Sequence, residues 1–338
     1  MSNTKKQIDF VISWVDGQDR EWKAIKKLYQ TELKGVDDRE VRYRDWDILR
    51  YWFRGVEEFA PWVGKIHFVT WGHIPNWLDV ENPKINIVNH RDILAEEFLP
   101  TFNSNAIELN LHRIPGLSQC FVYFNDDVFL TGKVCPEDFF IKGLPCDMLA
   151  LQPVVVKPDN TLMAQIYLNN MIVLSKYFNK RKNILSQPQG YFKLGYPLRY
   201  VFYNLLELSF PLFTGMMTLH GPAPLRKKTY DQLWEKEKEV LAATCRRRFR
   251  SGEDVNQYLF REWQKLSGKF YAKNVGKNFG YFELADMNDK LTKAIKKKKF
   301  RSICINDTRD KIDIEKVKKE LGQAFEEVLP DKSRFELY

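Results

Sequence analysis

The sequence lacks any run of about 18 uncharged apolar residues, so it offers no segment that would cross a membrane as a helix. Its opening residues, MSNTKKQIDF, also lack the apolar stretch of a signal peptide, which predicts a cytoplasmic protein. Cysteines are few: the five are scattered, odd in number and without C-x-x-C spacing. This pattern predicts free thiols and argues against a disulfide framework or a zinc site.

What the chain does contain is a large apolar fraction and an excess of positive charge. Hydrophobic residues make up 44% of the 338 positions and aromatic residues 14%, which supports a substantial core and excludes a disordered chain. The formal charge of +9 attracts anions such as nucleotides, anionic lipids or nucleic acid. The densest basic cluster, KAIKKKKFR at 293–301, could be a solvated face or a membrane-surface patch.

Strand-like and helix-like segments alternate over the first 130 residues. Short apolar runs rich in β-branched or aromatic residues predict strands at 8–17, 65–72 and 84–90. Apolar residues at helical spacing predict helices at 19–33, 45–60 and 104–116. This alternation predicts an α/β fold, Rossmann-like, with a mostly parallel sheet flanked by helices.

The rest of the chain is less regular. Residues 141–215 show no clear period, whereas helical spacing returns from 225, with a capping box predicted to start a helix at Ser251. A late strand at 300–307 is expected to return to the sheet, and a final helix ends before Pro330. We expect one catalytic domain over 1–338: an α/β half at 1–140, a variable insertion at 141–215 that could meet the acceptor, and a second half at 216–338 whose helical portion closes the site.

The segment FVYFNDDVFL reads as an apolar strand interrupted by Asn125, Asp126 and Asp127. Burying an unpaired carboxylate costs roughly several kcal/mol, so two adjacent acids in such a strand predict a function. In open α/β sheets ligands bind beyond the carboxyl ends of strands, where Asp16 and Thr70 also fall. Because carboxylates hold Mg²⁺ and the metal offsets phosphate charge, the group suggests a metal-bound nucleotide diphosphate.

Basic groups that suit such a ligand occur later in the chain. The segment TCRRRFRSGED supplies four arginines at 246, 247, 248 and 250, and a guanidinium can bind phosphate through two hydrogen bonds. A solvated basic edge is the alternative reading. His220 precedes prolines at 222 and 224 that stiffen the backbone, so its side chain could be held for acid–base work. His112 lies near a helix end, where the helix dipole favours a cation.

Several long segments resemble, in order, the four conserved regions of the Stealth proteins. They are IDFVISWVDGQD, RYRDWDILRYWFRGVEEFAPWVGKIHFVT, LPTFNSNAIELNLHRIPGLSQCFVYFNDDVFL, HGPAPLRKKTYDQL with RFRSGEDV, and CIND. Stealth proteins are sugar-phosphate transferases of bacterial capsule and cell-surface polysaccharide synthesis. The family includes the catalytic part of the animal enzyme that places N-acetylglucosamine-1-phosphate on lysosomal glycoproteins.

The resemblance implies transfer of hexose-1-phosphate or N-acetylhexosamine-1-phosphate from a UDP-sugar to a hydroxyl of a glycan acceptor, with release of UMP. Phosphoryl transfer needs positioning and charge neutralisation, which suits Mg²⁺ or Mn²⁺ as cofactor. The implied partners are the UDP-sugar and a glycan acceptor that could be lipid-linked. That acceptor would bring the enzyme into peripheral contact with the anionic inner face of the plasma membrane. The oligomeric state is left open.

The resemblance also implies roles for individual residues. The catalytic residues would be Asp127, His220 and Arg250. The metal ligands would be Asp126, Asp127, Asn306 and Asp307. The substrate-binding residues would be Trp14, Asp16, Gly17, Asp19, Arg44, Thr70, Asn103, Ser104, His112, Arg113, Asn125 and Arg248. Ile12-Ser13 and Trp71 depart from the family pattern where a nucleotide-sugar would be bound, so the donor sugar is not specified.

Two alternatives belong to other classes of function. A metal-dependent glycosyltransferase would also bind a UDP-sugar through acidic residues, but it would release UDP instead of UMP. A nucleic-acid-binding module would explain the positive charge. Against it, no RRM, OB or helix-turn-helix pattern is visible, and basic residues are interspersed with acids. We therefore expect no nucleic-acid partner.

Overall fold

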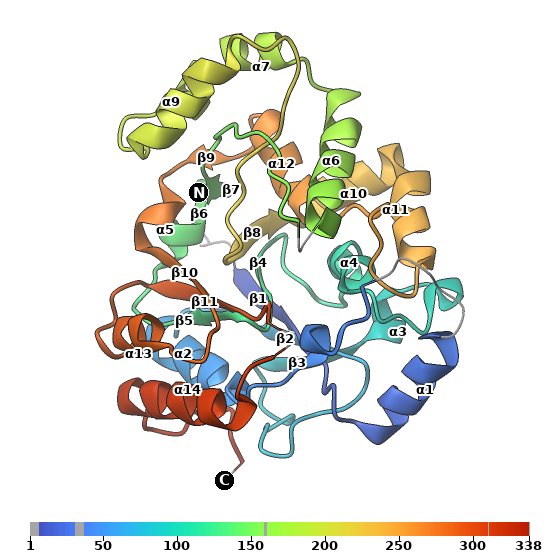
Figure 1. The fold of residues 1–338 in the computed structure, drawn as a ribbon, viewed down its shortest axis with the longest axis vertical. Helices are drawn as coiled ribbons and strands as arrows, with labels where there is room; N and C mark the ends of the chain where they lie inside the picture. Colours follow the sequence, from blue (N-terminus) through green and yellow to red (C-terminus); the bar gives the residue numbers. More distant parts are fainter. Residues whose placement is uncertain (1–6, 31–36, 159–160, 310, 338) are drawn as a thin grey trace, which may run out of the picture.

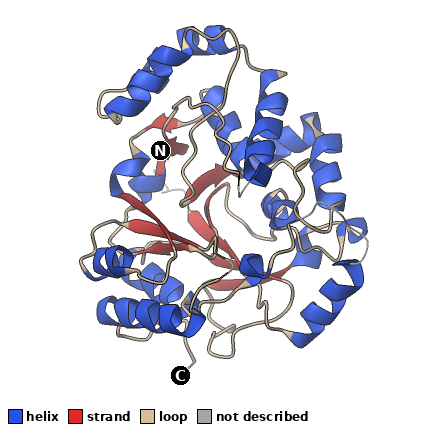
Figure 2. Cartoon of the chain, in the orientation of Figure 1, coloured by secondary structure: helices blue, strands red, loops and turns tan. Residues whose placement is uncertain are grey.

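The computed structural model describes residues 7–30, 37–158, 161–309 and 311–337. Its central sheet contains β1 (Ile8–Ser13), β2 (Ile66–Thr70), β3 (Ile85–Asn89), β4 (Cys120–Phe124) and β8 (Ala223–Arg226). The strand order is β3-β2-β1-β4-β8, and every pairing is parallel except that of β8 with β4 (Figure 1). Helices lie on both sides of the strands (Figure 2). The predicted α/β fold with a mostly parallel sheet is confirmed.

Helices cover the sheet and recur throughout the later chain. In the first half they are α1 (Arg20–Gln30), α2 (Leu49–Phe59), α3 (His90–Ile93), α4 (Ser104–Glu108) and α5 (Pro136–Phe139). The insertion contains α6 (Thr161–Ser175), α7 (Lys180–Ser186), α8 (Pro188–Tyr191) and α9 (Leu198–Glu207). The last third contains α10 (Lys227–Lys236), α11 (Lys238–Arg246), α12 (Tyr258–Leu266), α13 (Asp289–Lys296) and α14 (Ile314–Val328).

Two apolar clusters cover the two faces of the central sheet. Successive strand residues point to opposite faces, so Phe10 joins one cluster and Val11 joins the other. The first cluster includes apolar side chains of α2 and α14, and the second includes those of α10, α11 and α12. The sheet is therefore buried on both sides, as the nearly continuous apolar strands require.

The segment FVYFNDDVFL is not one strand, as its apolar residues suggested. β4 ends at Phe124, and β5 (Val128–Leu130) belongs to a second sheet with β10 (Phe279–Glu283) and β11 (Ser302–Asn306). The Val128 N–H donates to the Asn125 carbonyl (3.0 Å), which closes a turn between the two sheets. The predicted late strand exists as β11, but it pairs with β10 and β5 and does not return to the central sheet.

One predicted helix is divided in the structure, and another agrees with its prediction over the described residues. The segment 104–116 forms α4 and then a separate 3₁₀ turn at Leu111–Arg113, because the Asn110 side chain donates to the Ala106 carbonyl (2.8 Å) and competes with the helix. α1 follows the prediction for 19–33, of which 31–33 lie outside the described residues.

β6 (Phe140–Ile141), β7 (Leu144–Asp147) and β9 (Tyr271–Ala272) form a third, small sheet.

Neither cysteine pairing nor a membrane-spanning helix occurs in the described chain. All five cysteines are free thiols, and four of them are buried. Among the described residues, no helix combines the length and apolar character needed to span a bilayer.

Candidate active site

A cavity of about 550 Å³ lies at the carboxyl ends of β1 and β4. Trp14 enters it directly after β1, and the Asn125–Asp127 turn enters it directly after β4. The other walls come from α4, α6 and β10 and from the segments 218–220 and 305–308. The sheet topology therefore assembles one cavity from segments that lie far apart in the sequence.

Nine of the predicted site residues line this cavity. They are Trp14, Arg44, Asn125, Asp126, Asp127, His220, Arg250, Asn306 and Asp307. The set includes all three predicted catalytic residues and all four predicted metal ligands. The roles themselves remain predictions, but the side chains that would have to cooperate do lie together.

Asp127 and His220 form the central contact of the cavity. His220 Nε2 lies 3.0 Å from Asp127 Oδ2, and His220 Nδ1 lies 2.6 Å from the Tyr258 hydroxyl. The other carboxylate oxygen, Asp127 Oδ1, has no hydrogen-bond partner among the described residues. The Ile305 N–H donates to the Asp127 carbonyl (2.8 Å), which fixes this turn against β11. The pair is thus held on both sides, and one buried oxygen of Asp127 has no partner among the described residues.

Burial and neighbouring charge shift the pKa of His220 and the pKa of Asp126. Burial alone would lower the pKa of His220, but the negative charge and hydrogen bond of Asp127 outweigh it and hold that pKa above its usual value. Asp126 is exposed toward the cavity, yet the protein around it removes water from its carboxyl group. This desolvation first, and the adjacent Asp127 second, raise the pKa of Asp126 to about 7. The carboxyl group of Asp126 therefore takes up a proton at a higher pH than an ordinary aspartate does.

Glu108 is a cavity residue that the sequence did not reveal. Its side chain is buried, and its Oε1 lies within hydrogen-bond range of the Tyr123 hydroxyl (3.3 Å) and Asn125 Nδ2 (3.4 Å). Burial raises the pKa of Glu108, against the opposing charge of Arg250. The available signal was its position one helical turn after Ser104. Tyr258 was also missed, because its spacing is that of an ordinary apolar helix face.

Arg250 is the member of the arginine cluster that reaches the cavity. Its Nε donates to Ser104 Oγ (3.0 Å), and its Nη2 contacts the same hydroxyl. Ser104 is the first residue of α4, so the predicted pair of Ser104 and Arg250 is joined at a helix start. On another wall, Arg44 Nη1 donates to Asp307 Oδ2 (3.0 Å). Each cationic side chain is therefore held in place by a contact beside the cavity.

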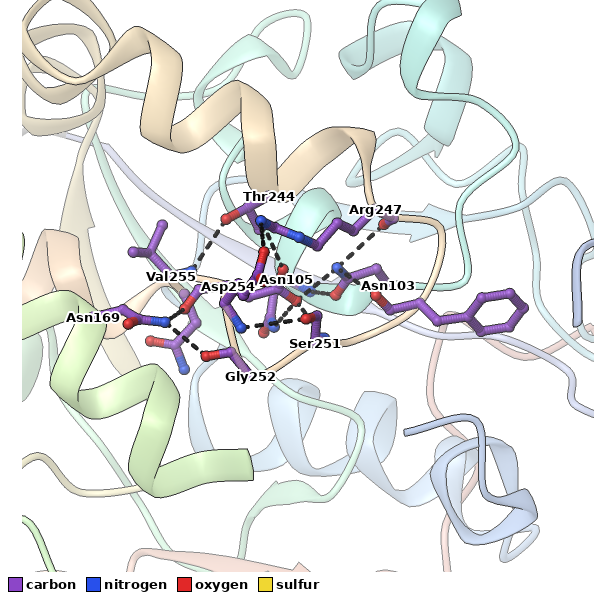
Figure 3. Close-up of polar contacts among 12 residues, drawn as sticks. Asn103, Asn105, Asn169, Thr244, Arg247, Ser251, Gly252, Asp254 and Val255 are labelled. Atoms are coloured by element: carbon purple, nitrogen blue, oxygen red, sulfur yellow. Dashed lines mark hydrogen bonds and ion pairs between the residues drawn. The ribbon is translucent and has the colours of Figure 1, made fainter. Parts of the chain in front are cut away.

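A buried polar network holds the arginine-rich loop against α4 (Figure 3). The Asp254 carboxylate accepts hydrogen bonds from Asn103 Nδ2 (2.9 Å), Asn105 Nδ2 (3.1 Å) and the Ser251 N–H (3.0 Å). Asn169 Nδ2 of α6 donates to the Gly252 and Asp254 carbonyls. Because Asp254 serves this network, no helix starts at Ser251 as predicted, and α12 begins at Tyr258. Asn103 is fully buried in the network and does not line the cavity.

The remaining predicted substrate residues lie outside the lining of the cavity. They are Asp16, Gly17, Asp19, Thr70, Asn103, Ser104, His112, Arg113 and Arg248. Asp19 caps the start of α1, and Thr70 Oγ1 donates to the His73 carbonyl (2.8 Å). His112 stacks on Tyr230 on the other side of the sheet, and burial lowers its pKa to about 3. His112 therefore does not provide the positive charge at a helix end that the sequence predicted.

Oxygen atoms in the cavity suit a divalent cation. Asp127 Oδ1 has no partner among the described residues, Asp126 opens to the cavity, and Asn306 lines the same wall. Mg²⁺ and Mn²⁺ prefer such oxygen ligands. Asp307, also predicted as a ligand, is already paired with Arg44. The oxygen set of Asp126, Asp127 and Asn306 thus fits the expected cofactor.

A second combination of donor atoms overlaps this set. The ligand atoms of Asp127, His220 and Cys304 lie within 4.8 Å of one another. One oxygen, one nitrogen and one sulfur form a set more typical of zinc than of magnesium. Burial, followed by the charge of Asp127, keeps the pKa of the Cys304 thiol well above its usual value, which disfavours the thiolate that a metal would bind.

Comparison with known proteins identifies relatives of the whole chain. The model of Stealth protein CR2, conserved region 2, matches residues 42–146. The receptor polysaccharide phosphotransferase WefC of Streptococcus gordonii is 40% identical, over 98% of this chain and 99% of that protein. A capsular polysaccharide phosphotransferase WcwK of Streptococcus pneumoniae is 41% identical over the same shares. A solved structure of the galactosyltransferase LgtC covers 94% of this chain and 96% of its own, with 12% identity and a TM-score of 0.38, which is too low to support an inference.

Proposed function

The chain belongs to the Stealth family of polysaccharide phosphotransferases, and from this premise we propose that it moves a sugar-1-phosphate from a UDP-sugar to a hydroxyl of a glycan acceptor. The sugar would be a hexose or an N-acetylhexosamine. In this reaction the acceptor oxygen attacks the β-phosphorus, and a new P–O bond forms. The bond from the β-phosphorus to the bridging oxygen breaks, UMP leaves, and the anomeric C–O bond is retained. The product is a phosphodiester within a polysaccharide.

The observation that carries the proposal is the Asp127–His220 pair beside Arg250 in one cavity. An acceptor hydroxyl needs a group that takes its proton as the new bond forms. Both imidazole nitrogens of His220 have partners, so the ring must release one before it can accept a proton. Asp127 Oδ1 is the acceptor in this pair without a partner. We assign the proton transfer to the pair acting together: Asp127 accepts the proton of the acceptor hydroxyl as the new P–O bond forms, and His220 holds the carboxylate in position through its Nε2.

Positive charge for the phosphates would come from two sources. Arg250 lines the cavity, and its guanidinium is held there by Ser104 at the start of α4. A divalent cation held by Asp126, Asp127 and Asn306 would offset the charge of the diphosphate. Trp14 and Tyr167 line the same cavity and offer aromatic faces for the uracil or the sugar.

The experiment that tests the function is product analysis. The purified protein would be incubated with a panel of UDP-sugars, Mg²⁺ and a glycan acceptor, and the released nucleotide would be separated. UMP together with a phosphodiester product is expected. Release of UDP would support the glycosyltransferase alternative instead, because that enzyme breaks the anomeric C–O bond.

Arg250→Lys should slow transfer at least tenfold, equivalent to about 1.4 kcal/mol in the barrier. Lysine keeps the charge but loses the planar fork that contacts Ser104 and would bind phosphate through two hydrogen bonds. Initial rates of UMP release would measure this. The matched control is Arg246→Lys, because Arg246 lies outside the lining of the cavity. Its side chain is half exposed, and its Nε lies 3.9 Å from Oε2 of the exposed Glu97. Equal rates for both variants and the wild type would move phosphate binding elsewhere.

We further propose that residues 1–338 act as one catalytic unit, because one core cluster combines residues from Ile8 to Phe335 and the other combines residues from Val11 to Phe270. A lipid-linked acceptor would require peripheral contact with the inner face of the plasma membrane. The basic cluster at 293–301 is a weak candidate for that contact. Lys296 pairs with Glu327 and Arg301 pairs with Asp138, so part of its charge is already neutralised.

A further inference from the structure

Residues 161–215, the helical part of the insertion, form a segment that exposes an unusual amount of apolar surface. More than half of the exposed large hydrophobic side chains of the described chain lie within it. Leu194 is 99% exposed and Leu198 is 85% exposed, and a group of such residues, unlike a single exposed leucine, marks an interaction site. Figure 1 places α7 and α9 at one end of the long axis of the molecule, away from α13 and α14. This end of the molecule therefore needs an explanation of its own.

Helix α9 is amphipathic, but it faces the opposite way from a helix of a water-soluble core. Leu198, Phe202 and Leu206 repeat every four residues on one side of the helix, and all three are exposed. The inward side carries Tyr200, which belongs to a small core cluster, together with the buried polar residues Asn204 and Glu207. In water alone, burial of the leucine side would be the favoured arrangement. The helix therefore turns its apolar side toward something other than water.

The inward polar side of α9 is fully bonded, so this orientation is built into the fold. Asn204 Oδ1 accepts from the Leu151 N–H (2.7 Å), and Asn204 Nδ2 donates to the Tyr191 carbonyl (2.7 Å). Glu207 Oε2 pairs with Lys180 Nζ at 2.5 Å. Buried polar groups with such partners specify one orientation of the helix. Rotating α9 to hide its leucines would break all of these contacts.

The charge around the apolar side has one sign. Glu207 is the only acidic residue between positions 161 and 222, and Lys180 neutralises it inside the protein. Arg181, Lys182 and Lys193 are exposed in the same segment. The accessible surface of the insertion thus combines apolar side chains with cations and carries no carboxylate among its described residues.

We propose that this surface docks onto an anionic lipid bilayer. The docking face consists of the exposed side chains Leu185, Leu194, Leu198, Phe202, Leu206 and Leu212 with the surrounding cations. Apolar groups enter the headgroup boundary while lysine and arginine bind the anionic headgroups. A second copy is a poorer occupant, because a two-fold contact would place the same cations opposite each other.

Docking would bring the cavity to the membrane surface. Helix α6 lines the cavity with Ala164 and Tyr167 and also carries the exposed Leu168 and Ile172, so it connects the cavity with the apolar surface. The inference deepens the proposed function, since an acceptor carried by a lipid would be met at this face. It does not depend on the chemistry, because lipid binding can be measured without donor or acceptor.

The test is co-sedimentation of the full chain with vesicles of phosphatidylcholine, alone or mixed in equal parts with phosphatidylglycerol. We expect binding to the mixed vesicles that weakens as salt rises. The triple variant Leu198→Ser, Phe202→Ser, Leu206→Ser should lower the partition coefficient at least about tenfold, because apolar area drives interfacial binding. Arg181→Gln with Lys182→Gln and Lys193→Gln should weaken binding to the mixed vesicles alone. Single Leu194→Ser should act in the same direction, and it lies outside any helix, where it does not affect folding of α9.

Matched controls carry the same chemistry elsewhere. Met287→Ser with Leu337→Ser removes two exposed apolar side chains outside the insertion, and glutamine at 296–299 removes the other basic cluster. Neither should alter binding. The proposal would be overturned if the wild-type protein bound neither kind of vesicle. It would also be overturned if the serine variants bound the mixed vesicles as strongly as the wild type. Light scattering that shows a dimer dissociated by the serine changes would overturn it as well, because the face would then be a contact between copies. UMP release with a soluble acceptor, measured separately, would remain intact in each case if the proposed function holds.

Discussion

His220→Ala is expected to lower the rate of sugar-phosphate transfer by about 100- to 10,000-fold while the protein still binds UDP-sugar. The imidazole contacts Asp127 through Nε2 and Tyr258 through Nδ1, so its removal leaves Asp127 without the hydrogen bond that orients its carboxylate for the proton transfer. Donor binding should survive, because the phosphate contacts belong to Arg250 and the strand ends. Calorimetry with UDP-sugar and initial rates of UMP release separate the two effects.

Two further measurements decide what His220 does. Added imidazole should restore part of the lost rate, since the small molecule can fill the space left by the side chain. Tyr258→Phe serves as the matched control, because it removes the other partner of the ring and should cost no more than about tenfold, the value of one net hydrogen bond. Loss of donor binding in proportion to the rate would make His220 a substrate ligand. Full activity of His220→Ala would make it a structural histidine.

Asp127→Asn should reduce transfer at least about 1,000-fold and leave the fold intact. Asparagine has nearly the same shape, and the backbone contact from Ile305 to residue 127 is independent of the side chain. The change removes the one free carboxylate oxygen of the pair and the charge that raises the pKa of His220. Rates of UMP release measure the effect, and thermal unfolding followed by circular dichroism checks the fold.

Asp126→Asn is the control for Asp127→Asn. Both residues lie in a turn at the cavity, so they are not separated on opposite faces of a strand. Asp126 does not contact His220, and we expect its loss chiefly to raise the Mg²⁺ concentration needed for half-maximal rate. Near-normal transfer by Asp127→Asn, or identical metal dependence for Asp126→Asn and wild type, would contradict these assignments.

Much of the candidate site was visible in the sequence because polar groups interrupt apolar patterns there. The Asn125–Asp127 turn and His220 stand out against their surroundings, and all of them line the cavity. Residues with an ordinary pattern were missed for the same reason. Glu108 is a single acid within a helix-like pattern and does not interrupt an apolar strand, and Tyr258 has the spacing of a core residue. Conversely, Asn103 resembles a binding residue but is used inside the fold, in the network around Asp254.

Local spacing of apolar side chains in the sequence was enough to predict β1, β2, β3 and β4, their parallel arrangement and the final helix, because that spacing decides which face each element buries. It did not predict β8, the antiparallel fifth strand of the central sheet. Only the tertiary structure decided that β5 leaves that sheet, and that Asp127 meets a histidine 93 positions later. It alone decided the helices of the insertion. There the usual rule is reversed, since α9 buries Asn204 and Glu207 through specific hydrogen bonds and exposes its leucines. Such contacts join segments distant in the chain, and no local pattern encodes which partner a buried polar group will find.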